Sequence, residues 1–366
     1  MTDLNGKHGF RMTGGKKNET VATLLLQWYD THRRDLPWRA HPGETKPPYE
    51  IWLSEIMLQQ TTVATVKDYY RSFLQRWPTI EDLADAPLDD VLHAWQGLGY
   101  YARARNLHKC AQAVAYELKG HFPRTEKGLL ALPGIGDYTA AALMALAYGK
   151  KATPVDGNIE RVVSRLFRIA TPMPEGKSDI RRHAVELTPD ERPGDYAQAM
   201  MDLGATLCSP KKPACSLCPL GSLCEARMQG DGETFPRRKA KPPKPTRHAI
   251  IYWIERPDGA VLLRKRPEKG LLGGMMEFPS TDWTEKPVDV ASGKRNAPAP
   301  AIWKRLPGEV RHTFTHFHLT LTILSGKTRG VPAVNGLWCA PDDFKDHALP
   351  TVMKKVARHA LKNRSN

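Results

Sequence analysis

The amino-acid sequence predicts two differently built parts, an α-helical first part of about 230 residues and an α+β second part. In the first part, apolar residues recur at helical spacing, as over residues 91–98 and 107–114. In the second part, the runs HAIIYWIE, AVLLRKR and HFHLTLTIL are rich in β-branched and aromatic residues and are separated by turn signals. Four of the six cysteines lie between Cys208 and Cys224, which places a metal-binding segment at the end of the helical part.

Size and charge narrow the class of protein. A length of 366 residues is long for one hydrophobic core and predicts two or three domains. The formal net charge of +15, from 54 Lys and Arg against 39 Asp and Glu, favours a polyanionic partner such as nucleic acid. No apolar run approaches the roughly 20 residues that span a bilayer, and residues 1–20 have no signal-peptide pattern. We therefore expect a cytoplasmic protein, without a membrane partner, whose residues 1–20 are flexible.

Two polar stretches punctuate the chain. Residues 230–246 (GDGETFPRRKAKPPKPT) are crowded with Pro and Lys and predict a semi-extended linker at the domain boundary. Residues 284–300 (TEKPVDVASGKRNAPAP) are polar and rich in Pro and Ala, and predict a long, mobile insertion rather than an element of secondary structure.

The cysteine run has the spacing Cys208-x6-Cys215-x2-Cys218-x5-Cys224, with prolines stiffening the loop between the cysteines. In a reducing compartment such crowding indicates a metal site rather than disulfides. Zinc is the alternative, but zinc ribbons usually carry two separated C-x-x-C knuckles and only one is present here. The spacing therefore favours an iron-sulfur cluster.

A second motif, LPGIGDYTAAALMALAYG, occupies residues 132–149. A short helix ends near Leu132, the segment from Pro133 to Gly136 makes a tight turn, and a second helix runs from Tyr138 to Tyr148. Glycines in such a turn let the backbone approach a phosphate, which the N–H groups at the start of the second helix can bind without reading bases. The alternative is an ordinary turn with no ligand.

Two carboxylates stand out by their positions. Asp156 precedes a helical pattern and is predicted to be its N-cap, which would keep the carboxylate ionised. Glu55 lies in the almost wholly apolar segment YEIWLSEIMLQQTTV, where desolvation would raise its pKa and make it a candidate general acid. The alternatives are a plain helix cap for Asp156 and an exposed or ion-paired side chain for Glu55.

The order of WLSEIMLQQT, GLGYYARARNL, LPGIGDYTA, VDGN and the four-cysteine run resembles the endonuclease III superfamily, and within it the adenine DNA glycosylases of the MutY type. The resemblance implies an all-α helix-hairpin-helix core at residues 21–153, a six-helix barrel, and a 4Fe-4S cluster domain at residues 154–229. The N-terminal helix would pack with the cluster domain. The cluster ligands would be Cys208, Cys215, Cys218 and Cys224.

The same resemblance implies a mechanism. Bifunctional relatives carry a Schiff-base lysine two residues beyond the last hairpin glycine, a position that Tyr138 occupies here, so we expect a monofunctional glycosylase without lyase activity. Glu55 would protonate adenine at N7, and Asp156 would stabilise the oxocarbenium-like sugar. Asn158 would orient the carboxylate pair, and Tyr138 would bond to the active-site carboxylate.

Because the target bond lies inside a duplex, the adenine must be flipped into a pocket. The resemblance implies a pocket lined by Trp38, Arg39, Gln198 and Met201. A core position is an equal alternative for Trp38 and the preferred interpretation for Met201. Residues near the opposite base and the phosphates would be Gln60, Thr61, Leu98, Tyr100, Gly134 and Gly136, with Gln60 and Tyr100 wedged into the base stack. A plain hydrophobic role is the alternative for Tyr100.

Residues 247–366 resemble the Nudix-like 8-oxoguanine-sensing domain of the same family. The acidic R-E-x-x-E-E signature of Nudix hydrolases is missing, which argues against nucleotide hydrolysis. The reading loop would be Phe314, Thr315 and His316, with Thr315 in place of the family's serine. Alternating histidines here favour a strand over a metal site. The expected partner is double-stranded DNA with adenine opposite 8-oxoguanine or guanine, bound by a nucleoid-associated monomer.

Three other functions compete with this expectation. A glycosylase/lyase is disfavoured by Tyr138, and a Nudix hydrolase lacks its acidic residues. A non-enzymatic iron-sulfur DNA-binding regulator would keep the cysteines and the basic charge, but it has no need for Glu55 together with Asp156.

Overall fold

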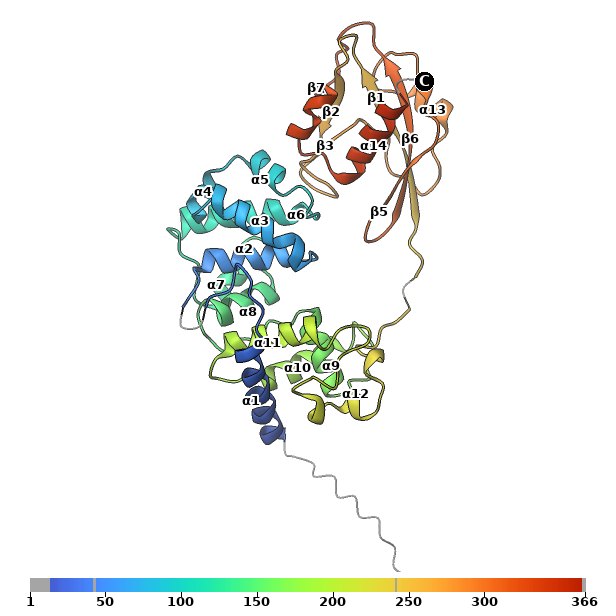
Figure 1. Cartoon of the computed structure of the whole chain (residues 1–366). Helices are drawn as coiled ribbons and strands as arrows, with labels where there is room; N and C mark the ends of the chain where they lie inside the picture. The colour runs from blue at the N-terminus through green and yellow to red at the C-terminus, as the bar shows by residue number, and fades with distance from the viewer. Residues whose placement is uncertain (1–13, 42–43, 241, 364–366) are drawn as a thin grey trace, which may run out of the picture. The chain divides into compact units, whose positions relative to one another are not determined.

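The computed structural model describes residues 14–41, 44–240 and 242–363. The chain forms two compact units (Figure 1). Unit 1 comprises the residues up to Ala84 together with Lys109–Ala240, and unit 2 comprises Asp85–His108 together with the residues from Lys241 onward. Within the described ranges, no helix combines the length and apolarity that crossing a membrane requires.

Unit 1 is helical, as the sequence predicts. Its longer helices are α1 (Gly14–His32), α2 (Pro48–Leu58), α3 (Val63–Arg76), α8 (Asp137–Leu146), α9 (Gly157–Leu166), α10 (Lys177–Leu187) and α11 (Pro193–Thr206). Shorter elements are α4 (Ile80–Asp85), the π-helix η1 (Ala113–Glu117), α7 (Glu126–Leu130), η2 (Gly221–Leu223), α12 (Glu225–Met228) and η3 (Gly232–Thr234). Helix α6 (Ala102–Gln112) begins in unit 2 and ends in unit 1.

Helix α1 belongs to the core of the second half of unit 1. Its buried residues Val21 and Leu25 share a hydrophobic cluster with α9, α10 and α11, and the cysteine loop packs against this cluster. Residues 14–20, which the sequence assigned to a flexible start, are the first turns of α1, whereas residues 1–13 lie outside the described residues. The N-terminal helix therefore packs beside the segment that carries the cysteines.

The first part of the expected linker is anchored to unit 1. Phe235 is buried, Arg168 forms an ion pair of 2.8 Å with Asp231, and the backbone N–H of Met173 donates to the carbonyl of Arg237 over 2.8 Å. Because strand β1 begins at Thr246, the connection between this anchored segment and the sheet is only a few residues long.

Unit 2 contains a seven-stranded mixed sheet. Its strands are β1 (Thr246–Glu255), β2 (Val261–Lys265), β3 (Met276–Glu277), β4 (Lys304–Arg305), β5 (Val310–Thr313), β6 (His318–Lys327) and β7 (Leu337–Cys339). The order is β3-β2-β1-β6-β4, with β5 added to β6 and β7 to β2. The long central strands β1 and β6 are parallel, with Thr246 opposite His318 and Glu255 opposite Lys327.

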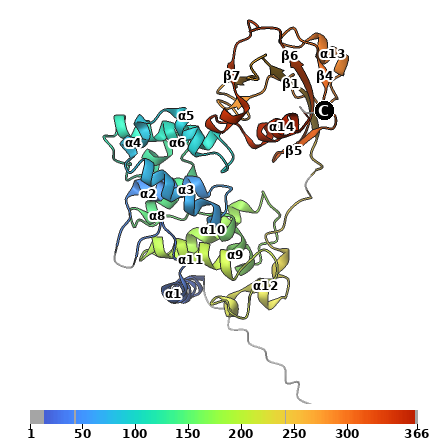
Figure 2. The same cartoon turned by 45° about the horizontal axis from the view of Figure 1, so that its top comes forward.

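Both faces of this sheet are covered. Helix α14 (Thr351–Lys362) and the short η4 (Pro341–Asp346) pack on one face, against alternate residues of β1 and β6 (Figure 2). The segment around α13 (Val290–Arg295) packs on the other face, where Tyr252 donates to the carbonyl of Gly293 over 2.9 Å. The prediction that residues 284–300 contain no element is therefore wrong, because Asp289 caps a helix there.

Residues 85–108 form part of unit 2. They contain α5 (Leu88–Ala94) and the start of α6. Lys265 pairs with Asp89 at 2.7 Å, and the Gln96 amide donates to the carbonyl of His347 over 2.9 Å. The segment that the sequence assigned to the helical barrel thus makes side-chain contacts with the C-terminal sheet domain.

Candidate active site

Glu55 and Tyr138 form the centre of the candidate site. Helix α2 is apolar on nearly every side, so Glu55 is only 4% exposed. The Tyr138 hydroxyl, in the first turn of α8, donates to Oε2 of Glu55 over 2.8 Å. Burial raises the pKa of Glu55 from 4.5 to about 7; the charge of Asp156 adds to the rise, while Tyr138 and Arg39 oppose it. A carboxyl group with this pKa is suited to general acid catalysis.

Asp156 is the N-cap of α9, as predicted. Its Oδ1 accepts from the backbone N–H of Asn158 at 2.9 Å and of Ile159 at 2.7 Å, and its Oδ2 accepts from the Asn158 amide at 2.8 Å. The capping bonds favour the ionised carboxylate, as expected, but burial has the larger effect, so the pKa of Asp156 is raised above its ordinary value.

A glycine lets Asn158 approach helix α11. A Cβ atom added to Gly204 would lie 2.5 Å from the Cβ and 3.1 Å from the Cα of Asn158. Helices α9 and α11 therefore touch closely where α9 begins, and this contact fixes Asn158 and the capping carboxylate of Asp156. Asn158 thus lies beside Asp156, where the resemblance placed it.

Arg161 connects this helix start to the cysteine loop. Its Nη2 donates to Oδ1 of Asn158 at 2.8 Å and to the carbonyl of Gly204 at 2.7 Å, and its Nε donates to the carbonyl of Cys208 at 2.7 Å. Sequence reasoning missed Arg161. Its position one helical turn beyond the cap was the available signal.

The four clustered cysteines are free thiols, each half-buried. Burial raises the pKa of Cys218 to about 11, and the charges of Cys208, Cys224 and Cys215 add to the rise. The Arg165 guanidinium donates to Sγ of Cys208 over 3.2 Å. Within the described ranges, no three or more His, Cys, Asp or Glu side chains converge on a point that would hold a metal ion.

The expected adenine-pocket residues have different surroundings. Trp38 is buried and packs edge-on against Tyr70, with ring centroids 5.5 Å apart. Met201 packs against the core formed by α1, α9, α10 and α11, in agreement with the core position that the sequence favoured for it. Arg39 forms an ion pair of 2.6 Å with the buried Asp202, and Gln198 accepts a hydrogen bond from Tyr29 at 3.1 Å.

The residues expected near the opposite base are mostly exposed. Gln60 and Tyr100 are exposed and have positive φ values of 60° and 48°, which non-glycine residues rarely adopt. Thr61 is half-buried. Leu98, by contrast, is 4% exposed, so its side chain belongs to the core in this structure.

The hairpin glycines are open to solvent. Gly134 has a φ of 77°, a conformation that favours glycine, and Gly136 precedes the first residue of α8 with open space where a Cβ would lie. The turn between α7 and α8 therefore leaves the N–H groups at the start of α8 accessible to an anion.

The β5–β6 turn carries the expected reading loop. Thr315 and His316 are exposed, and the Thr315 hydroxyl lies 2.6 Å from the Tyr100 hydroxyl within unit 2. Phe314 is half-buried and stacks on Trp283, with ring centroids 5.8 Å apart. Phe314 therefore anchors the loop by packing against Trp283. Sequence reasoning missed Trp283.

A buried carboxylate of strand β3 is paired with two arginines. Glu277 is 1% exposed and forms ion pairs with Arg264 and Arg266. The two guanidinium groups occupy both of its oxygens.

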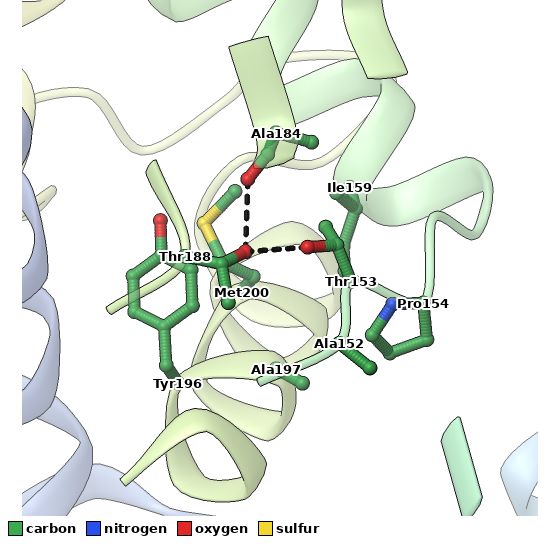
Figure 3. A pocket seen from close by; sticks show the side chains of 9 residues that line it. All are labelled: Ala152, Thr153, Pro154, Ile159, Ala184, Thr188, Tyr196, Ala197 and Met200. Atoms are coloured by element: carbon green, nitrogen blue, oxygen red, sulfur yellow. Dashed lines mark hydrogen bonds between the residues drawn. The ribbon is translucent and has the colours of Figure 1, made fainter. Parts of the chain in front are cut away.

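A small cavity lies beneath the start of α9 (Figure 3). Its volume is about 10 Å³, enough for one water molecule and far too small for adenine. Thr153 and Thr188 form a 2.7 Å hydroxyl pair beside it, and the buried Tyr196 hydroxyl has no hydrogen-bond partner among the described residues. This cavity is a packing defect rather than a base-binding pocket.

Comparison with known proteins agrees with this arrangement. Residues 53–190 match the HhH-GPD superfamily of base excision DNA repair proteins, and residues 250–359 match the NUDIX domain. A thermostable thymine-DNA glycosylase is 34% identical, with a TM-score of 0.53, and the match covers 58% of this chain and 98% of that protein. An endonuclease III in a non-covalent DNA complex, 23% identical with a TM-score of 0.51 over 60% of this chain and 99% of that one, shares the fold. The fold and site define a helix-hairpin-helix DNA glycosylase that carries a Nudix domain.

Curated relatives identify the family. The adenine DNA glycosylase of Homo sapiens is 38% identical over 91% of this chain and 72% of the human protein. The adenine DNA glycosylase of Rattus norvegicus is 37% identical over 91% of this chain and 76% of the rat protein. The chain belongs to the adenine DNA glycosylase family.

Proposed function

We propose that this chain is a monofunctional adenine DNA glycosylase, which hydrolyses the N-glycosidic bond of adenine opposite 8-oxoguanine or guanine in duplex DNA. The main support for this proposal is that the two carboxylates of the site, Glu55 and Asp156, have different hydrogen-bond partners. Glu55 is buried and bonded to a phenol, whereas Asp156 is bonded to three N–H groups at a helix start. Environments that differ in this way divide acid and anion roles between two carboxylates.

The two carboxylates would act in sequence. Glu55, whose pKa of about 7 keeps a large fraction protonated at neutral pH, donates its proton to N7 of the flipped adenine and makes the base a better leaving group. Asp156 faces the developing positive charge of the sugar and stabilises or captures it. Glu55, now ionised, accepts a proton from the attacking water. The net reaction consumes one water and releases adenine and an abasic site.

Tyr138 supports the absence of lyase chemistry. Burial raises the pKa of Tyr138 well above 10, so the phenol stays protonated and donates to Glu55. A phenol cannot form the imine with the sugar that strand cleavage requires. The Tyr138→Lys variant, by contrast, introduces an amine at this place, and borohydride should trap a covalent adduct between that variant and DNA.

We also propose a 4Fe-4S cluster held by Cys208, Cys215, Cys218 and Cys224. Four half-buried free thiols on a loop that contains three prolines have the chemistry of a donor set for such a cluster, which when bound would crosslink the loop and add negative charge beside Arg165. Iron and sulfide analysis of protein purified without oxygen tests this. Stoichiometric zinc without iron would favour the alternative metal.

The C-terminal domain would read the opposite base. The exposed Thr315 hydroxyl and His316 ring lie on a tight turn that Trp283 and Phe314 support. Hydroxyl and imidazole groups can accept the N7 proton or contact the 8-oxygen that distinguishes 8-oxoguanine from guanine. The positive net charge of +15 favours the duplex as a whole.

One experiment tests the proposed function directly. Duplexes with labelled adenine opposite 8-oxoguanine, guanine or thymine are incubated with the protein, and half of each sample is treated with alkali. A monofunctional adenine glycosylase gives cleaved strands only after alkali, and gives most product opposite 8-oxoguanine. Cleavage without alkali would reveal a lyase, and no release of adenine from any duplex would refute the proposal. Light scattering should report a monomer of 41.0 kDa.

A further inference from the structure

Asp202 is a buried acid that the mechanism above does not use. It lies on α11 and is 0% exposed. Its two oxygens accept from both terminal nitrogens of Arg39, at 2.6 and 2.7 Å, and from Nε and the backbone N–H of Arg34, at 2.6 and 3.0 Å. All four bonds are charge-assisted or satisfy a backbone donor, so the carboxylate is fully engaged.

These bonds keep Asp202 ionised. Burial alone would raise the pKa of Asp202, but the guanidinium groups of Arg39 and Arg34 hold it below its ordinary value. The bidentate pairing with Arg39 also fixes the plane of that guanidinium group, because two parallel bonds leave it no rotation. Arg39 further donates to the carbonyl of Arg34 at 3.2 Å.

The charge of Arg39 acts on the reaction centre, at Glu55, where it favours the carboxylate over the protonated acid. Its guanidinium lies over the ring of Tyr29 at 5.9 Å, and the hydroxyl of Tyr29 donates to Oε1 of Gln198 over 3.1 Å. Gln198 and Asp202 are one turn apart on the same face of α11.

We propose that Asp202 is a positioning residue for this glycosylase reaction, because its bidentate pairing fixes Arg39 over the ring of Tyr29, the residue that bonds to Gln198. The inference rests on the proposed function, since Arg39 and Gln198 are its expected adenine-contacting groups. Asp202 itself acts only through Arg39. If the Arg39–Asp202 pair merely filled the core, it would not control the proton affinity of Glu55.

The Asp202→Asn variant removes the bidentate pairing that holds Arg39, with little change in side-chain volume. An amide offers one acceptor oxygen, so the bidentate pair is lost and Arg39 is free to leave Glu55. Excision of adenine opposite 8-oxoguanine in single turnovers should fall about tenfold to a hundredfold, the size of effect that a misplaced active-site group produces. Asp195→Asn is the matched control, because Asp195 is on the same helix and pairs with Arg192 at 2.8 Å on the surface. It should stay within about twofold of wild type.

A double-mutant cycle identifies the path. Arg39→Met should lower excision, and adding Asp202→Asn to it should cause no further loss beyond about twofold, because two residues that act through one group are not additive. Multiplicative losses would overturn the inference, as would wild-type excision by Asp202→Asn. Should Asp202→Asn fail to fold by circular dichroism, Asp202→Glu shifts the carboxylate by one methylene and enters the same cycle.

The titration of Glu55 gives a readout that does not require activity. In protein labelled with ¹³C at the glutamate carboxyl groups, the Glu55 signal is the one that Glu55→Gln removes. Both Arg39→Met and Asp202→Asn should move its midpoint to higher pH, because the cation that favours the carboxylate has left. No movement would mean a purely structural pair, and a shift to lower pH would mean that Arg39 stays in place without the bidentate pairing. A wild-type protein that releases no adenine but shows the expected shifts would refute the proposed function alone.

Discussion

The hydroxyl of Tyr138 lies 2.8 Å from Oε2 of Glu55 and donates a hydrogen bond to it from the first turn of the neighbouring helix. The bond favours the carboxylate, whereas burial and the nearby Asp156 favour the neutral acid, and burial has the larger effect. The balance sets a pKa near neutrality, so the proton that adenine must receive is held loosely enough to be transferred.

The pH dependence of excision should reflect this balance. Because Glu55 acts as an acid, the single-turnover rate should be high below pH 7 and fall as pH rises through about 7. Tyr138→Phe removes a bond that lowers the pKa of Glu55, so its midpoint should lie at higher pH than that of wild type. Rates measured from pH 5.5 to 9 check both points. If Tyr138→Phe left this midpoint unchanged, a group other than Glu55 would control the fall in rate at high pH.

Glu55→Gln should abolish adenine release and leave duplex binding largely intact, because an amide keeps the shape of the side chain but has no acidic proton. The same substitution should stabilise the protein at high pH. The free energy of unfolding of wild type should decrease as pH rises from 4.5 to about 7, since the folded state binds the Glu55 proton more tightly than the unfolded state does.

The size of that effect follows from the shift. A rise in the pKa of Glu55 from 4.5 to about 7 means that wild type loses on the order of 3 kcal/mol of its free energy of unfolding above pH 7. The Glu55→Gln variant should not show this loss. Urea unfolding at pH 5 and pH 8 measures it, and the difference between variant and wild type should be larger at pH 8. Equal differences at both pH values would contradict a raised pKa for Glu55.

Gly204→Ala tests the contact that fixes Asn158. The added methyl carbon would lie 2.5 Å from the Cβ of Asn158, so the start of α9 must move, at a cost of about 1 to 3 kcal/mol. Excision should fall, because Asp156 is part of that helix start. Gly232→Ala, where a Cβ meets nothing within 4 Å, is the control for both stability and rate. If Gly204→Ala kept full activity, the close approach of α9 and α11 would be irrelevant to the site.

Much of the site could be predicted because it depends on local sequence. A glutamate in an apolar helix is placed to be buried, and an aspartate before a helical pattern is placed to cap it, so local sequence marked Glu55 and Asp156 as candidates and the family resemblance supplied their roles. The direction of the pKa shift of Asp156 could not be predicted, because local sequence shows the capping donors but not the depth at which the carboxylate is buried.

What the sequence could not show depends on distant segments meeting. Asp202 follows the same pattern as Glu55, an acid on a buried helix face, but its partner Arg39 is 163 positions away in the chain. The helix α13 was missed for another reason: its composition is polar, and it is held on the sheet by Tyr252 of β1, whose hydroxyl donates to the carbonyl of Gly293. Such contacts have no signature in composition or periodicity.

The last prediction separates chemistry from lesion reading. A fragment ending at Ala240 keeps Glu55, Tyr138, Asp156 and the four clustered cysteines, which all belong to unit 1. It should fold and should excise adenine opposite guanine, although residues 85–108 lose partners such as Lys265. A fragment ending at Ala226 should be less stable, because it lacks the buried Phe235.

What the longer fragment loses is the turn that presents Thr315 and His316. A good hydrogen-bonded base contact contributes about 1 to 3 kcal/mol of discrimination, so the preference for 8-oxoguanine over guanine should shrink by about tenfold or more in binding and in single-turnover excision. Full-length protein carrying Phe314→Ala and His316→Ala should shift in the same direction by a smaller amount, because Thr315 and the sheet remain. Since both proteins retain the two carboxylates, a loss confined to preference would locate recognition in unit 2. An active fragment with unchanged preference would instead assign recognition to the expected wedge residues that the fragment keeps, Gln60 and Tyr100, which are both exposed and have positive φ.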